Sequence, residues 1–274
     1  METRELRYFV AVAEELNFGR AAQRLGMAQP PLSRAIQQLE RRLGVTLLER
    51  SSRGVALTDA GAVLLREGRA ALDAVAAAER RTRREGARIV LVTKAGASDE
   101  LVAKLLAAYA AEPGSAEVDV RLCGPGEQER MLRDGRADVA ILHRPFDSLT
   151  GFDVEELHTE GQVAVLPAGH PLTAREQLRS DELDELTLPR WPGADGSYRP
   201  GPGPEVHDST QLMQLIALGR AAAVLPESVR HALREGVVAV PVSDAPRVTT
   251  VIAWPPHSRS LAVAGLVRAA VGRP

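Results

Sequence analysis

The chain has 274 residues, 45% hydrophobic and 26% charged, a composition typical of a globular protein with room for one small domain and one or two larger ones. Charges interrupt every apolar run near the N-terminus, and no run is long enough to cross a bilayer. We therefore expect neither a signal peptide nor a membrane span, and a cytoplasmic protein. The single cysteine excludes an internal disulfide.

The net charge of the whole chain, −2, argues against nucleic acid as a partner. The charge differs, however, when it is counted separately for the two parts of the chain. Residues 1–86 hold 15 Arg, no Lys and 11 acidic residues, a net charge of +4, whereas residues 87–274 carry −6. The positive charge therefore lies in the N-terminal third, where its sign suits contact with phosphates.

Three helices are predicted in the first 44 residues. Residues 3–16 carry an apolar stripe, and a short helix at 19–25 ends at Gly26. A third helix runs from about Gln29 to Gly44, and its first turn accommodates two prolines, Pro30 and Pro31. Its apolar stripe consists of Leu32, Ile36, Leu39 and Leu43.

The opposite face of the third helix carries side chains that can contact base edges or phosphates. They are Gln29, Ser33, Arg34, Gln37 and Arg41. A solvated polar face would explain an isolated helix of this kind. Here a short helix and a tight turn precede it, and a hairpin of residues 45–50 and 55–58 follows it, which predicts a winged helix-turn-helix.

Three further arginines are candidate DNA contacts in this arrangement. Arg50 and Arg53 belong to the hairpin and are placed to reach phosphates or the minor groove. Arg20 opens the second helix, where phosphate contact and simple solvation are equally good interpretations.

Residues 58–84 predict one long helix of about 40 Å, with Thr58 as its N-cap. Leu65, Leu72 and Val75 form an apolar stripe that an isolated helix would expose. Antiparallel pairing with the same helix of a second chain would cover this stripe, and packing on the chain's own C-terminal domain is the alternative. Gly61 and Gly68 would permit close approach.

Residues 1 to about 84 resemble the DNA-binding region of LysR-type transcriptional regulators. The matching segments are LRYFVAVAEELNFGRAAQRL, AQPPLSRAIQQLE, LGVTLLER and LTDAG, in the family's order and spacing. The resemblance implies a sequence-specific regulator of promoter DNA that acts as a homodimer or homotetramer, with RNA polymerase as a further candidate partner. One departure is Ala28, where many members have Ser, because Ala caps a helix less well by about 1 kcal/mol.

From residue 88 onward, strands alternate with helices. The expected strands are 89–93, 117–122, 138–142, 162–167, 186–188, 221–225, 237–241 and 248–253, and the expected helices are 99–111, 127–134, 209–218, 227–234 and one from 260. The first strand-helix-strand-helix-strand run predicts a parallel sheet. Two α/β lobes, with crossings near 160 and 255, fit the family's effector domain, which resembles periplasmic binding proteins. LRDGRADVAIL, VAVLPAGHPL and LGRAAAVLPES support this.

The predicted fold is therefore α+β overall. A winged helix-turn-helix DNA-binding domain occupies 1–58, a linker and dimerisation helix 59–87, and an effector-binding domain 88–274. The first lobe of that domain comprises about 88–161 and 256–274, and the second about 162–255.

We expect no enzyme activity, metal or cofactor. No two of the six histidines have the spacing of a helical zinc pair, and neither a phosphate-binding loop nor a nucleophile elbow is present. We interpret Cys123 as an incidental or structural thiol, and a redox-sensing thiol is the open alternative. Two other functions stay open at this point: a DNA binder that needs no effector, and a solute-binding protein or enzyme of the second domain's fold.

A small-molecule site is expected at the carboxyl ends of the parallel strands. The residues there are Thr93, Lys94, Ala95, Cys123, Gly124, His143 and Arg144, with Thr210 at a helix start in the second lobe. The resemblance implies an effector bound between the lobes at such strand ends. The two cations and the helix N-terminus favour an anion, so the candidate effector is a carboxylate. Exposed loop charges are the alternative interpretation of Lys94 and Arg144.

Overall fold

The computed structural model describes residues 1–51, 54–83, 88–193, 197–198 and 200–272. The chain divides into two compact units: an N-terminal unit, Met1–Arg83 with Arg133–Gly135, and an effector unit, Arg84–Leu132 with Arg136–Pro274. None of the helices in the described residues is long and apolar enough to cross a membrane.

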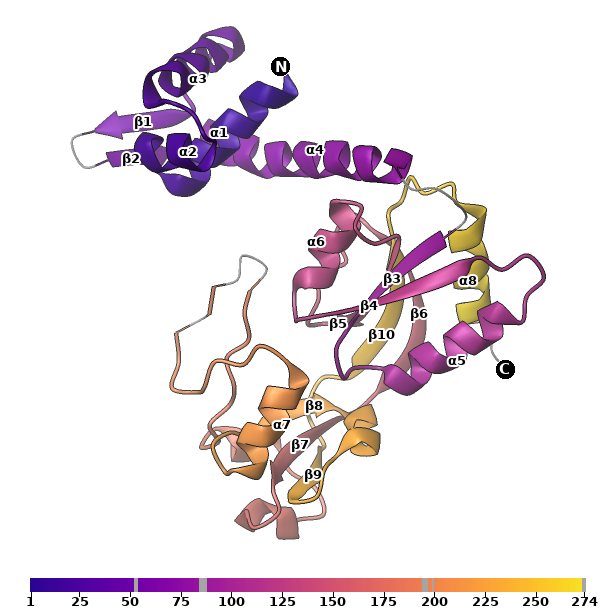
Figure 1. The fold of residues 1–274 in the computed structure, drawn as a ribbon. Coiled ribbons are helices and arrows are strands. Elements are labelled where there is room, and N and C mark those ends of the chain that lie inside the picture. Colours follow the sequence, from indigo (N-terminus) through magenta and orange to yellow (C-terminus); the bar gives the residue numbers. More distant parts are fainter. Residues whose placement is uncertain (52–53, 84–87, 194–196, 199, 273–274) are drawn as a thin grey trace. The chain divides into compact units, whose positions relative to one another are not determined.

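The N-terminal unit contains the three predicted helices, the hairpin and the long helix (Figure 1). In chain order these are α1 (Thr3–Glu15), α2 (Phe18–Arg24), α3 (Gln29–Leu43), β1 (Leu48–Ser51), β2 (Gly54–Leu57) and α4 (Asp59–Arg83). Gly26 and Gly44 both adopt a positive φ, as expected of residues that end helices. The hairpin begins at Leu48 rather than Val45, because the backbone N–H groups of Leu47 and Leu48 are bound by a side chain of α3.

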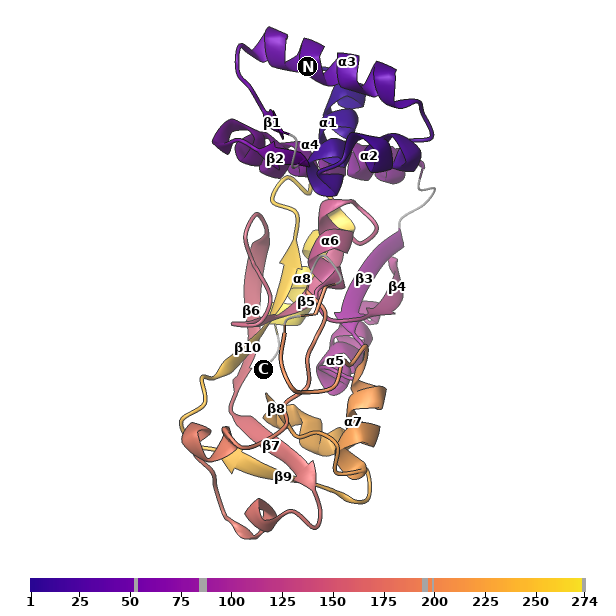
Figure 2. The same cartoon turned by 90° about the vertical axis from the view of Figure 1, so that its left-hand side faces the viewer.

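The core of this unit is formed by the apolar stripes of α1, α2 and α3. Phe9, Leu32, Ile36 and Leu39 are fully buried in it, as the periodicity predicts. Both views show α1 between α3 and α4 (Figure 1, Figure 2). The polar face of α3 is therefore left uncovered by the rest of the unit.

The effector unit contains two lobes. The first lobe holds β3 (Arg88–Lys94), α5 (Asp99–Ala110), β4 (Glu117–Cys123), α6 (Glu127–Arg133), β5 (Val139–Arg144), β6 (Asp153–Glu160), β10 (Val248–Trp254) and α8 (Leu261–Val271). Its sheet has the order β4-β3-β5-β10-β6. The strands β4, β3 and β5 are parallel, whereas β10 runs antiparallel to β5 and β6. Helices α5 and α8 cover one face of this sheet and α6 the other.

The second lobe is smaller. It holds β7 (Gln162–Pro167), two short 3-10 helices at Pro171–Ala174 and Ser180–Leu183, α7 (Ser209–Ala217), β8 (Ala223–Pro226), a third 3-10 helix at Glu227–Ala232 and β9 (Val237–Val242). Its three strands are antiparallel in the order β8-β7-β9. Helix α7 packs on one face of this sheet, against Val163 and Val165.

Three details correct the sequence prediction. Strand β10 belongs to the first sheet, so the second crossing lies between Val242 and Val248 rather than near 255. Residues 186–188 form no strand, and residues 227–232 form a 3-10 helix rather than an α-helix. Strand β6 was not predicted, because it lies at the sheet edge and carries charged residues at four of its eight positions, counting no histidine.

Candidate DNA-binding surface and effector site

Helix α3 has a buried apolar side and a mostly exposed polar side. Leu32, Ile36 and Leu39 are buried, whereas Gln29, Pro30, Pro31, Arg34 and Gln37 are exposed and Ser33 is half-buried. Arg34 makes no hydrogen bond or ion pair with any described residue. Its guanidinium is therefore available to a ligand. The N-cap residue Ala28 makes no side-chain cap bond, as its identity predicts.

The hairpin arginine Arg50 is already engaged within the protein. Its guanidinium donates to Ser33 Oγ at 2.9 Å and stacks over the ring of Phe18 at 4.2 Å from the centroid. Arg50 therefore links the hairpin to α3 and α2, a role that the sequence did not suggest. The other predicted hairpin contact, Arg53, lies outside the described residues.

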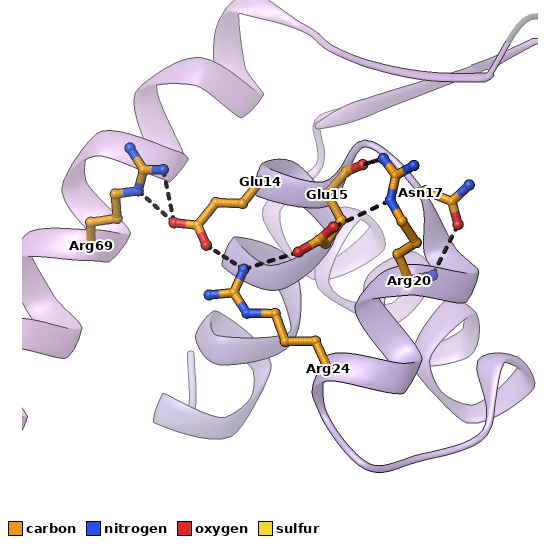
Figure 3. A network of polar contacts seen from close by, with 6 residues as sticks. All are labelled: Glu14, Glu15, Asn17, Arg20, Arg24 and Arg69. Atoms are coloured by element: carbon orange, nitrogen blue, oxygen red, sulfur yellow. Dashed lines mark hydrogen bonds and ion pairs between the residues drawn. The ribbon is translucent and has the colours of Figure 1, made fainter. Parts of the chain in front are cut away.

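Arg20 is held by a carboxylate at the end of α1. Its Nε lies 3.3 Å from Glu15 Oε2, and its guanidinium also donates to the Glu15 carbonyl oxygen (Figure 3). Asn17 caps α2 by accepting from the Arg20 backbone N–H at 3.0 Å. The Arg20 side chain remains 64% exposed, so phosphate contact stays open to it.

The position of α3 relative to the hairpin depends on a residue that sequence reasoning missed. Glu40 Oε1 accepts from the backbone N–H groups of Leu47 at 2.8 Å and Leu48 at 3.1 Å. A second carboxylate, Glu5 of α1, pairs with Arg42 of α3 at 2.7 Å. The only signal in the sequence was a carboxylate one turn before the helix-ending Gly44.

The apolar stripe of α4 is partly covered within its own chain. Leu65 and Leu72, predicted as dimer contacts, are half-buried and pack against the core of the N-terminal unit. Val75 is also half-buried, whereas Val63 is 49% exposed. Both glycines permit close approach, as predicted: a Cβ would lie 2.1 Å from Leu47 O at Gly61 and 2.8 Å from Leu6 Cδ1 at Gly68.

At the carboxyl ends of β3 and β5, Lys94 is not a free cation. Its Nζ lies 2.7 Å from both carboxylate oxygens of Asp147, and the two side chains are 16% and 6% exposed. Asp147 also accepts from the backbone N–H of His143 at 2.7 Å. Burial alone would raise the pKa of Asp147, but the hydrogen bonds from His143 and the charge of Lys94 outweigh it and lower that pKa.

Two other polar side chains at these strand ends are buried. His143 is buried, and its Nε2 lies 2.9 Å from Ser98 Oγ at the start of α5. Thr93 is buried, and its Oγ1 has no hydrogen-bond partner among the described residues. By contrast, Arg144 is exposed and pairs with Glu156, so it does not join Lys94 as a second cation.

The Cys123 thiol is a poor candidate for redox sensing. Burial, together with the negative charge of Glu127, raises its pKa to about 12. Its Sγ lies 3.5 Å from the Thr93 carbonyl oxygen. Because the thiolate is the reactive form, this thiol fits the incidental role better.

The second lobe meets these strand ends through Ser209 rather than Thr210. Ser209 Oγ donates to the carbonyl oxygen of Ala95 at 2.8 Å, whereas Thr210 is exposed. Asp208 caps α7 by accepting from the Gln211 N–H at 2.8 Å, so that helix start already has one partner. The backbone of His207 lies close to Gly124, 3.4 Å from where a Cβ would stand.

Comparison with known proteins places these features in one family. Residues 3–62 match the sequence family described as bacterial regulatory helix-turn-helix protein, lysR family, and residues 82–273 match the family described as LysR substrate binding domain. The chain is 34% identical over 248 residues to the HTH-type transcriptional regulator AlsR of Bacillus subtilis (strain 168), covering 84% of this chain and 82% of that protein.

Two further relatives extend the likeness along the whole chain. The Hca operon transcriptional activator HcaR of Escherichia coli (strain K12) is 31% identical over 272 residues, covering 93% of this chain and 92% of that protein. The crystal structure of full-length CbnR complexed with the target DNA is 26% identical, with a TM-score of 0.54 and coverage of 99% of each chain. The chain therefore belongs to the LysR family of DNA-binding transcriptional regulators, with an effector-binding domain after its helix-turn-helix.

Proposed function

We propose that the exposed face of α3 contacts base edges in the major groove of promoter DNA, with Arg34 as its main base contact. One observation carries the proposal: Arg34 is exposed and unpaired within the described residues, on the side of α3 opposite the buried Leu32, Ile36 and Leu39. Gln29 and Gln37 flank Arg34 and supply the donors and acceptors that pair with adenine.

In the same proposal, Arg20 and Arg50 contact phosphates. Each is fixed on one side by the protein, Arg20 by Glu15 and Arg50 by Ser33 and Phe18. A side chain held in place loses less conformational entropy on binding, so these contacts support the register of α3. Arg53 is a further candidate phosphate contact on the ground of its place in the sequence alone.

Arg34→Ala should weaken binding to a specific duplex by about 1–3 kcal/mol, roughly 5- to 150-fold, if Arg34 makes a bidentate base contact. A band-shift titration of the full-length protein measures this change. Arg66→Ala on α4 is the matched control, because Arg66 is exposed and, among the described residues, its polar partner is Glu67 of the same helix. Equal affinities of Arg34→Ala and wild type, with the fold intact, would remove Arg34 from the interface.

We further propose that two chains pair through α4, as a homodimer or as a tetramer built from such dimers, in the cytoplasm where promoter DNA lies. The support is the half-buried stripe of Leu65, Leu72 and Val75 together with the exposed Val63. Part of that stripe already packs on the chain's own core, so the remaining apolar surface of α4 is the part offered to a partner. RNA polymerase is a further partner in this proposal, on the ground of the family resemblance.

The proposed effector site lies where the loop after β3 meets the start of α7, with Thr93, Lys94, Ala95, Cys123, Gly124 and His143 on the first lobe. A carboxylate remains the candidate chemistry, but it has to compete with Asp147 for Lys94, because that ammonium already holds both Asp147 oxygens. The hydrogen bond from Ser209 to Ala95 supports a role for lobe closure. A ligand that binds the closed form better would then shift the DNA-binding state of the chain.

Ser209→Ala should lower effector affinity by about fivefold, because it removes one neutral hydrogen bond, worth about 1 kcal/mol, from the closed form. Calorimetric titration with acetate and small dicarboxylates, and with their uncharged amides as comparison ligands, measures both the affinity and the charge preference. Thr210→Val is the control, because Thr210 is exposed and should leave affinity unchanged. The proposal fails if Thr210→Val has the larger effect, and the carboxylate part fails if the amides bind better.

A further inference from the structure

A carboxylate at the end of α1 joins three helices of the N-terminal unit. Glu14 Oε2 lies 2.7 Å from a guanidinium nitrogen of Arg24, the last residue of α2. Its other oxygen, Oε1, accepts from two guanidinium nitrogens of Arg69 on α4, both at 2.8 Å (Figure 3). The Glu14 side chain is only 21% exposed, less than half the exposure of either arginine.

The neighbouring carboxylate has a narrower role. Glu15 pairs with Arg20 at 3.3 Å and with Arg24 at 3.5 Å, and both of these arginines belong to α2. In the network of Figure 3, only Glu14 therefore reaches the long helix. The hydrogen bond from Arg24 to Glu14 is also the chief reason that the pKa of Arg24 is raised.

Apart from the hydrogen bonds that Thr58 donates to Thr46 and Leu47 just before α4 begins, the contacts that Leu65, Gly68 and Leu72 make between α4 and the core are apolar. At Gly68 the helix passes so close to Leu6 that a Cβ would lie 2.8 Å from Leu6 Cδ1. Contacts of this kind resist separation and sliding, but because they are non-directional they oppose a small rotation of α4 about its own axis less strongly. The forked contact of Arg69 with one Glu14 oxygen is directional, and Arg69 directly follows Gly68 in the sequence.

We propose that Glu14 is a positioning residue that fixes the rotation of α4 against the helix-turn-helix, and thereby sets the spacing of the two DNA half-sites that a dimer recognises. The proposal rests on pairing of two chains through α4. In such a dimer, each α3 is carried by its own α4, so a rotation of α4 against α1 changes the distance between the two reading helices. Dimeric helix-turn-helix proteins require half-sites about one helical turn apart, and that distance has to match the protein.

The network is suited to orientation more than to stability. Arg24 and Arg69 are half exposed, and ion pairs in such positions contribute little to folding. Loss of the Arg69 contact should therefore shift the Tm of the N-terminal unit by less than about 4 °C. A merely structural role would produce a Tm shift with unchanged half-site spacing, which separates the two explanations.

The experiment measures binding of the full-length protein to duplexes in which two half-sites are separated by a series of spacer lengths. Glu14→Gln keeps the shape of the side chain and removes its charge, and Arg69→Met removes only the α4 partner. Arg66→Met is the matched control, because Arg66 pairs with Glu67 on the same helix and makes no hydrogen bond or ion pair with α1 within the described part of the chain.

Wild type and Arg66→Met should each show one preferred spacing. In Glu14→Gln and Arg69→Met, the preference for that spacing over its one-base-pair neighbours should fall by about fivefold, while affinity for a single half-site stays unchanged. Retention of the wild-type preference in both variants overturns the role of Glu14. If wild type shows no preferred spacing, or sediments as a monomer, pairing through α4 is wrong, and this outcome is distinct from failure of Glu14 alone.

Discussion

Asp147→Asn is expected to lower the free energy of unfolding of the effector unit by about 3–5 kcal/mol, because it leaves the ammonium of Lys94 without a counter-charge in a mostly buried position. The substitution also weakens the hydrogen bond that the His143 backbone N–H donates to residue 147, because an amide is a weaker acceptor than a carboxylate. Urea unfolding followed by circular dichroism measures the change. The double variant Lys94→Met with Asp147→Asn should recover much of the loss, since no buried charge then remains.

The pH dependence of this effect follows from the lowered pKa of Asp147, whose ordinary value is 3.8. A depressed carboxyl pKa contributes stability that is fully present above the ordinary value and is lost as the pH falls through the folded-state value. The difference between wild type and Asp147→Asn should therefore be constant near neutral pH and shrink below about pH 4. A difference under about 1 kcal/mol at pH 7 would mean that solvent screens this pair.

Gly61→Ala is the second substitution with a large expected effect. An added Cβ would stand 2.1 Å from Leu47 O and 2.9 Å from Leu57 Cδ2, so α4 and the hairpin could not both keep their places. Overpacking against backbone should cost about 3 kcal/mol and weaken DNA binding, since it displaces the strands that carry Arg50. Thermal unfolding measures the cost.

The sign of the Gly61→Ala result is informative by itself. In a helix free of steric conflict, replacing Gly with Ala stabilises by about 1 kcal/mol. Any increase in Tm would therefore contradict the close contact between α4 and the hairpin. Gly169→Ala is the control, because a Cβ built there would have no described atom within 4 Å beyond its own chain neighbours.

Much of the N-terminal unit could be predicted from the sequence, since its determinants are local. The spacing of Leu32, Ile36 and Leu39 fixes which face of α3 is buried, and the exposure of Arg34 on the other face follows from the same period. The wing was also found, but the role of Arg50 was not. Its partners Ser33 and Phe18 lie 17 and more residues away, so no local pattern identifies them.

The effector site was predicted less well, because its contacts join distant segments. Lys94 was expected to be a free cation, but its partner Asp147 lies 53 residues further along the chain. Ser209 rather than Thr210 contacts the first lobe, since the one-residue difference in helix position decides which side chain faces Ala95. Strand β10 was assigned to the wrong lobe, because an apolar run does not show which sheet it joins.

The central claim, that the exposed face of α3 contacts the bases of promoter DNA, is tested most directly by selecting duplexes from a randomised library with full-length wild type and Arg34→Ala. The account predicts that wild type enriches a sequence with two symmetric half-sites, and that Arg34→Ala loses the base preference at one position of each half-site while keeping the others. Enrichment of the same sequence with the same preference at every position by both proteins would contradict it.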